Sequence, residues 1–334
     1  MTKEEGIQSY RGYINRIGWC LVIFLGLINA LGSFGIVMGE LLTEWLPSDI
    51  AAAISGIIDT LFYLAYFLVP GILFYAMSRH HAAQPIRCTV RVPKATPLII
   101  LAGVAVVQTA GILNQWFCTA IGYYLPADDM LTYTDTPTAI VSYMTVALAP
   151  AFAEEFLFRG VIFGNLRPFG RTQAVLISAM LFGLMHENVA QIFYAPTVGV
   201  VLALVYEYTG SIWCSVFIHL FNHQYSVLQS VLYSRFTEVP ANVILYALHA
   251  VIILAGGISM LLLLTKRRDW DKQVRDDRSI WGHTDEGLLR IKQPLDLPTA
   301  LRQCTAPGML VFLILAVLST IFTVLMVWGG GLLS

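Results

Sequence analysis

Residues 241–265 read ANVILYALHAVIILAGGISMLLLLT and contain no Asp, Glu, Lys or Arg. A helix needs about 20 mostly apolar residues to cross the hydrocarbon core of a bilayer. This stretch is long enough to cross, and it carries no charged face that a soluble protein would turn toward water. We therefore expect the chain to lie in a membrane.

Eight further apolar stretches lie outside this one, which makes nine candidate spans in all. The fifth and the sixth are short and interrupted, so the sequence predicts an all-α, polytopic transmembrane helical bundle of about 8–9 spans. We expect residues 1–334 to form a single membrane domain. The eight further stretches are 17–39, 52–77, 97–118, 137–158, 173–188, 192–208, 212–232 and 308–329.

The composition of the chain supports a membrane location. Apolar residues make up 57% of the sequence and charged residues 12%, about half the ~25% of a soluble globular protein. This excludes a secreted soluble enzyme and a disordered chain. With 20 basic and 21 acidic residues, no global field attracts polyanions, so we expect no nucleic-acid partner. Five scattered cysteines without a CxxC pair predict free thiols.

The basic residues are distributed unevenly between the two sides of the predicted bundle. If the N-terminus is cytoplasmic, 18 of the 20 Lys and Arg residues fall on that side, nine of them between Lys266 and Arg302. Such an excess marks the cytoplasmic side. We therefore expect a multi-pass protein of the cell membrane, in contact with its lipids, with a cytoplasmic N-terminus and a cytoplasmic loop at 266–307. An extra C-terminal span would follow at 308–329.

Two acidic residues stand at the end of the fourth apolar stretch, in the sequence AFAEEFLFRG (151–160). Charges inside a span are costly and need a reason. Arg159 follows Glu155 by four residues, the spacing at which an acid and a base pair on a helix. Glu154 has no equally good partner, which is typical of a carboxylate that acts as a general base. An ion-pair cluster that closes the helix is an equally good interpretation of the two glutamates and Arg159.

Two later stretches carry polar residues at helical spacing. Phe182 and His186 lie one turn apart in AMLFGLMHEN. His186 and Glu187 do not begin an HExxH zinc motif, because the fifth position, residue 190, is Ala. His219, Asn222 and His223 share one helical face in HLFNHQY. Imidazole and amide donors on that face are suited to stabilise a negative charge that develops during a reaction. Two histidines one turn apart are also spaced to bind zinc.

Taken in order, these motifs resemble the CAAX prenyl protease and bacteriocin-processing family of intramembrane proteases, also called Abi proteins. The resemblance rests on Glu154, Glu155 and Arg159, then Phe182 and His186, then a histidine-led motif after Gly-Ser-Ile-Trp, and it covers about residues 150–225. It implies a catalytic core at about 137–234 whose cavity opens toward the cytoplasm, and hydrolysis of a peptide bond by an activated water.

The resemblance also implies roles for single residues. Glu154 and His186 would activate the water, Glu155 with Arg159 would organise the helix end, and His219 would help to bind the oxyanion. The family has Asn or Asp four residues after this histidine, where this chain has His223. Asn222 stands beside that position. We favour donor roles for His219 and His223 over zinc binding, because a metal-bound nitrogen cannot donate a proton. We therefore expect no cofactor.

These observations favour an intramembrane glutamic endopeptidase of the CAAX prenyl protease and bacteriocin-processing (CPBP) type that acts on a membrane-associated peptide or a lipidated protein. Two alternatives from other classes remain. An ion- or proton-coupled transporter would also carry intramembrane carboxylates and histidines, although no matching halves with paired discontinuous segments are visible. A non-catalytic bacteriocin self-immunity protein would be recognised by loss of Glu154 or His186, and both residues are present.

Overall fold

A computed structural model describes residues 3–78, 83–90, 92–122, 140–141, 143–266 and 294–330. Within these ranges the secondary structure is helical, apart from an isolated bridge between Cys88 and Ser211. This confirms the predicted all-α class. All five cysteines are free, as their spacing predicted.

In the described part of the chain, five helices are long and apolar enough to cross a membrane, judged by length and composition. Each contains one of the predicted spans. Helices α1, α2 and α3 come from the first third of the chain, while α10 and α13 come from its last third. Their bounds are Lys3–Trp45 for α1, Ser48–Met77 for α2, Thr96–Ala120 for α3, Glu238–Thr265 for α10 and Pro307–Gly330 for α13.

The central part of the chain forms shorter helices between these long ones. Each predicted stretch here contains a helix, but α7 ends at Leu184, before the predicted 188, and α8 begins at Tyr194, after the predicted 192, so α7 has only 14 residues and α8 only 16. The number of membrane crossings therefore stays a prediction. The elements are η1 (Met144–Leu148), α5 (Ala149–Glu155), η2 (Phe156–Phe163), α6 (Gly164–Leu166), η3 (Arg167–Phe169), α7 (Arg171–Leu184), α8 (Tyr194–Thr209) and α9 (Ile212–Arg235).

The helix that carries the two glutamates is irregular, because η1 and η2 are π-helical and flank α5. Pro150 lies in the first turn of α5. Proline has no N–H to donate, and its ring clashes with the carbonyl one turn earlier. The wider π-turn of η1 accommodates this proline without breaking the helix. Local π-turns of this kind occur frequently at functional sites.

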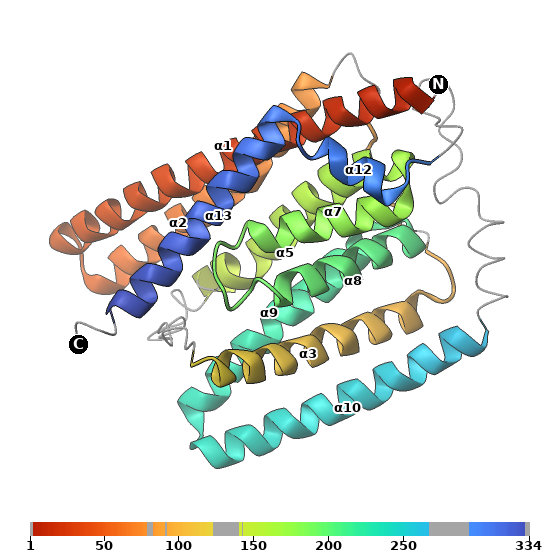
Figure 1. Cartoon of the computed structure of the whole chain (residues 1–334). Helices are drawn as coiled ribbons and strands as arrows, with labels where there is room; N and C mark the ends of the chain where they lie inside the picture. Colours follow the sequence, from red (N-terminus) through yellow and green to blue (C-terminus); the bar gives the residue numbers. More distant parts are fainter. Residues whose placement is uncertain are drawn as a thin grey trace.

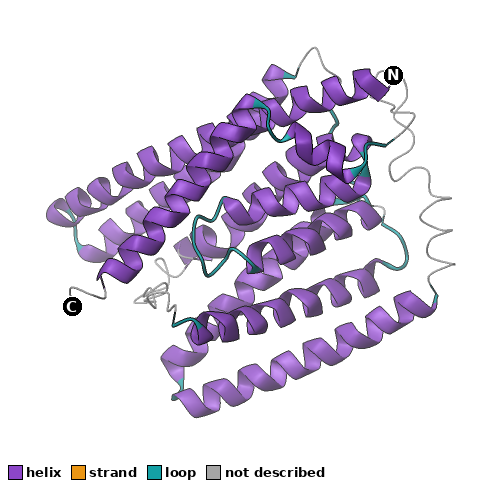
Figure 2. Ribbon diagram, viewed as in Figure 1, coloured by secondary structure: helices purple, strands orange, loops and turns teal. Residues whose placement is uncertain are grey.

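The helices run roughly parallel to one another in a bundle (Figure 1, Figure 2). Helices α2 and α13 pack against α1 on one side, and α10 packs against α3 on the opposite side. Helices α5, α7, α8 and α9 lie between these two groups. Most of their buried apolar side chains belong to one core that also includes residues of α1 and α13. The predicted catalytic motifs therefore lie on the inner helices or, for His186, in the turn after α7.

One end of the bundle is closed by an extended segment, residues 84–89. The Gln84 amide donates to Asn165 Oδ1 at 2.7 Å and the Arg87 amide donates to the Tyr206 hydroxyl at 3.0 Å. Arg167 pairs with Glu207 at 2.6 Å at the same end. The orientation of this end in the membrane stays a prediction.

Part of the predicted loop 266–307 is ordered against this end of the bundle, while residues 267–293 lie outside the described ranges. Residues 297–303 form the short helix α12 (Leu297–Gln303), which Asp296 caps by accepting from the Thr299 amide at 2.8 Å. The Leu295 amide donates to the Phe169 carbonyl at 2.7 Å. The C-terminal part of this stretch is therefore a docked helix rather than a loop.

Close backbone contact between α1 and α13 gives a prediction about packing. A Cβ on Gly18 would overlap the backbone of Met309, whereas a Cβ on Gly26 would meet nothing within 4 Å. We expect Gly18→Ala to lower the free energy of unfolding by about 1–3 kcal/mol, as overpacking does. Gly26→Ala, on the same helix, should leave it unchanged or raise it by about 0.5–1 kcal/mol. Thermal unfolding in detergent measures both, and equal midpoints would contradict the prediction.

Candidate active site

A buried ion pair lies at the centre of the inner helices. Arg159 and Glu155 are 1% and 0% exposed, and Arg159 Nη1 lies 2.8 Å from Glu155 Oε1. The i,i+4 spacing in the sequence predicted this pair. Arg159 Nη2 also donates to the Gly199 carbonyl of α8 at 3.2 Å. The guanidinium lies 4.5 Å above the centre of the Phe182 ring on α7.

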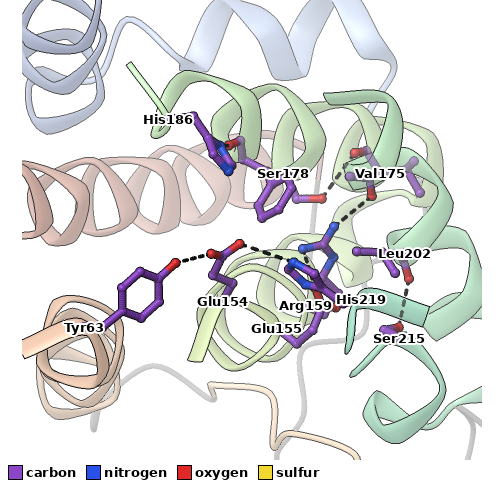
Figure 3. Close-up of polar contacts among 12 residues, drawn as sticks. Tyr63, Glu154, Glu155, Arg159, Val175, Ser178, His186, Leu202, Ser215 and His219 are labelled. Carbon is purple, nitrogen blue, oxygen red and sulfur yellow. Dashed lines mark hydrogen bonds and ion pairs between the residues drawn. The ribbon is translucent and has the colours of Figure 1, made fainter. Parts of the chain in front are cut away.

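His219 of α9 contacts both glutamates. Its Nδ1 lies 2.9 Å from Glu155 Oε1, and its Nε2 lies 3.7 Å from Glu154 Oε2 (Figure 3). Because Arg159 favours the ionised form of Glu155, we assign Nδ1 as the donor to that carboxylate. The second nitrogen, Nε2, is then directed at Glu154. This second role of Glu155, as an acceptor for His219, was not part of the sequence-based expectation.

Glu154 is 3% exposed and has two carboxylate oxygens in different surroundings. Oε1 accepts a hydrogen bond from the Tyr63 hydroxyl of α2, while Oε2 has no hydrogen-bond partner among the described residues. Figure 3 shows the carboxylate between Tyr63 and His219. Sequence reasoning missed Tyr63, because a tyrosine in an apolar helix carries no pattern that links it to a residue 91 positions away.

His186 lies in the turn that follows α7. The sequence predicted a stretch that continues to residue 188, but the helix ends at Leu184. The next residue, Glu187, has a φ of 52°, in the left-handed region that ends an α-helix. His186 Nδ1 lies 2.7 Å from the Phe182 carbonyl, so Nδ1–H is the donor and Nε2 keeps its lone pair.

The Phe182 ring contacts both His186 and His219. Its centre lies 5.1 Å from that of His186 and 5.9 Å from that of His219. His223 stacks on His219 at 4.8 Å with an interplanar angle of 19°, and its Nε2 is buried without a hydrogen-bond partner. The three motifs of the sequence therefore meet in space.

Asn222 faces a different set of neighbours. Its Oδ1 accepts from the Tyr194 hydroxyl at 2.7 Å and from Gln108 Nε2 at 3.4 Å. These residues come from α8 and α3. The carbonyl of Asn222 thus ties α9 to these two helices, while His219 contacts the glutamates and His223 stacks on His219.

No group of three or more His, Cys, Asp or Glu side chains in the described part of the chain is arranged to hold a metal ion. His219 Nδ1 is engaged with Glu155. Within the described residues, the cluster instead contains a carboxylate oxygen of Glu154 without a hydrogen-bond partner and, by the Nδ1–H assignment above, a lone pair on Nε2 of His186. Both are proton acceptors, which is what the activation of a water molecule requires.

The buried ion pair leads to a prediction about stability. Glu155→Gln and Arg159→Met each leave one buried charge without its partner, so each should lower the free energy of unfolding by about 3–5 kcal/mol. The double variant should lose less than the sum of the two single variants, because it leaves neither charge behind. The free energies of unfolding of the unchanged protein, the two single variants and the double variant, measured in detergent, complete this double-mutant cycle. Strict additivity would show that the two side chains do not interact.

Comparison with known proteins supports the resemblance of these motifs. Residues 136–224 match the Rce1-like family model, described as type II CAAX prenyl endopeptidase Rce1-like. A segment of 81 residues is 32% identical to the Bacillus subtilis (strain 168) protein named "Putative membrane peptidase YdiL". This segment is 23% of the present chain and 32% of YdiL, so the chain spans about a third of the length of the curated relative it matches.

No solved structure matches the chain. The family match covers η1, α5, η2, α7 and α8, together with α9 as far as residue 224. It therefore includes all three motifs that meet at Arg159. Through residues 136–224, the chain is similar to the type II CAAX prenyl endopeptidase Rce1-like family.

Proposed function

We propose that this protein is an intramembrane endopeptidase that hydrolyses a peptide bond with a water activated by Glu154 and His186. The single observation that carries the proposal is the unequal environment of two neighbouring glutamates. Oε1 of Glu155 is held by the charged Arg159 and by His219, whereas Oε1 of Glu154 is held by the neutral Tyr63 hydroxyl. Oε2 of each glutamate is buried without a hydrogen-bond partner among the described residues, and only Oε2 of Glu154 faces the second nitrogen of His219, at 3.7 Å. Two carboxylates with different surroundings are typical of acid–base sites in which one residue reacts and the other organises.

The proposed reaction uses atoms whose positions are given above. A water molecule between Glu154 Oε2 and His186 Nε2 loses a proton to Glu154 as its oxygen attacks the scissile carbonyl carbon. The proton then passes from Glu154 to the leaving amine nitrogen as the C–N bond breaks. Water is consumed, a carboxylic acid and an amine are formed, and Glu154 returns to its starting form. No oxidant or reductant is needed.

The negative charge on the carbonyl oxygen needs donors in this step. His223 Nε2 is buried without a partner, and in the tautomer that carries the proton on Nε2 it is a donor. His219 Nε2 carries a proton only in the imidazolium form, because Nδ1–H already donates to Glu155. We therefore assign oxyanion stabilisation to His223, with His219 contributing when it is protonated.

Two observations support a proposal for the substrate class. The matched family is described as type II CAAX prenyl endopeptidase Rce1-like, and the glutamates are buried on the inner helices of the bundle. We propose that the substrate is a membrane-associated peptide or a lipidated protein. The products would be released at the predicted cytoplasmic end of the bundle, the end that carries the described residues Arg167 and Arg171.

The first test of this function is the substitution Glu154→Gln. We expect it to reduce peptide cleavage by at least about 10²-fold, the low end for loss of a general base, with unchanged abundance in the membrane. The assay uses an internally quenched peptide in proteoliposomes, once with a farnesylated C-terminal Cys-aliphatic-aliphatic-X sequence and once without the lipid. Glu44→Gln on α1, an exposed glutamate, is the matched control.

Each outcome of this assay distinguishes between functions. Full cleavage by Glu154→Gln would remove the proposed mechanism. Cleavage of the lipid-bearing peptide alone would identify a prenylated substrate, and equal cleavage of both would identify a general membrane peptidase. If neither peptide is cleaved but proton flux through the liposomes depends on Glu154, the transporter function is favoured instead.

A second test separates a donor role of His223 from metal binding. If His223 donates a hydrogen bond, His223→Asn keeps a donor and should retain most of the activity, while His223→Ala should lose about 10²-fold or more. Elemental analysis should find well under one equivalent of zinc, and strong chelators should leave cleavage intact. Stoichiometric zinc whose removal abolishes cleavage, and whose return restores it, would make His219 and His223 a ligand pair.

A further inference from the structure

The Tyr63 hydroxyl is the one hydrogen-bond partner that the described residues provide for the Glu154 carboxylate. It comes from α2, which lies outside residues 136–224 and carries none of the three motifs. A helix near the N-terminus therefore contributes a polar group to the candidate active site. Figure 3 shows the phenol entering on the side of the carboxylate opposite His219.

The Tyr63 ring is held in place by other aromatic side chains. Its centre lies 5.2 Å from that of Phe67 and 6.1 Å from that of Tyr66. Phe67 is 1% exposed and packs against Phe24 of α1 at 5.0 Å. Aromatic contacts of this geometry favour a defined ring orientation. The hydroxyl is therefore directed at Glu154 by packing between α1 and α2.

A carboxylate needs such a restraint to act through one chosen oxygen. The terminal torsion of glutamate is broad and two-fold, so an unrestrained carboxylate exchanges its two oxygens freely. A hydroxyl that donates to an ionised carboxylate forms a charge-assisted bond, which is stronger than a neutral one. With Oε1 held by Tyr63, only Oε2 is left to face His219.

We propose that Tyr63 is a positioning residue that fixes the Glu154 carboxylate so that Oε2 alone receives the proton of the attacking water. This inference rests on the proposed function and deepens it. Tyr63 touches neither the water nor the peptide in this role. Its effect is exerted through Glu154, so it should alter the rate of the chemical step rather than the binding of the substrate.

The test is Tyr63→Phe, which removes the hydroxyl and keeps the ring. Loss of a hydrogen bond to a charged group, together with a small displacement of the base, should lower kcat by about 10- to 100-fold. KM should stay within about twofold, because the substrate does not contact this residue. Tyr66→Phe is the matched control, since Tyr66 lies three residues along the same helix and donates no hydrogen bond to Glu154.

The assay uses the same quenched peptides in proteoliposomes, with thermal unfolding of each variant measured in parallel. The proposal is supported if kcat falls in Tyr63→Phe alone while its unfolding midpoint and KM match those of the control. Unchanged kcat would overturn it. So would a rise in KM at constant kcat, an equal loss in Tyr66→Phe, or a loss of fold in Tyr63→Phe, which would make the hydroxyl structural.

The Glu154→Gln variant distinguishes failure of this inference from failure of the proposed function. If Glu154→Gln is inactive and Tyr63→Phe is fully active, Glu154 is the base and Tyr63 does not position it. If Glu154→Gln cleaves the peptide as fast as the unchanged protein, the proposed function itself fails, and the positioning role fails with it.

Discussion

The buried charge of Arg159 is the constraint on which the inner part of this fold depends. A guanidinium that is 1% exposed must find partners within the protein, because an unpaired charge in such surroundings is strongly destabilising. Glu155 supplies the opposite charge, Gly199 supplies a carbonyl, and Phe182 supplies an aromatic face. These contacts come from α5, α8 and α7. One side chain thus fixes the relative positions of three helices.

The same arrangement separates the two neighbouring glutamates. Glu155 lies toward Arg159 and His219, and both interactions are with its Oε1. Glu154 lies toward α2, where an aromatic hydroxyl meets it. Consecutive residues on a helix point in directions about 100° apart. The side chains of an adjacent pair can therefore face two different neighbouring helices. A structural carboxylate and an open one can therefore occupy consecutive positions only where different helices pack on each side.

The sequence predicted the helical segments and the local pairs well, because both depend on short-range periodicity. Each of the nine apolar stretches contains a helix, although residues 185–188 and 192–193 are not helical, and the Glu155–Arg159 pair follows from its spacing. Contacts between distant helices were not predictable in this way. Tyr63 had no signal in an apolar helix, and neither the end of α7 at Leu184 nor the left-handed backbone of Glu187 could be read from the apolar pattern. The hydrogen bond from His219 to Glu155 likewise required the packing of α9 on α5.

The shortness of α7 has a consequence for the surrounding lipid. Its 14 residues span about 21 Å, less than the ~30 Å thickness of the hydrocarbon core. The turn that follows contains His186, Asn188 and Gln191, and its polar groups bond to one another. Non-helical backbone at membrane depth is tolerated where protein surrounds it, and α7 packs against α8, η2 and α12. The polar groups of this turn are thus accommodated by neighbouring helices and not by acyl chains.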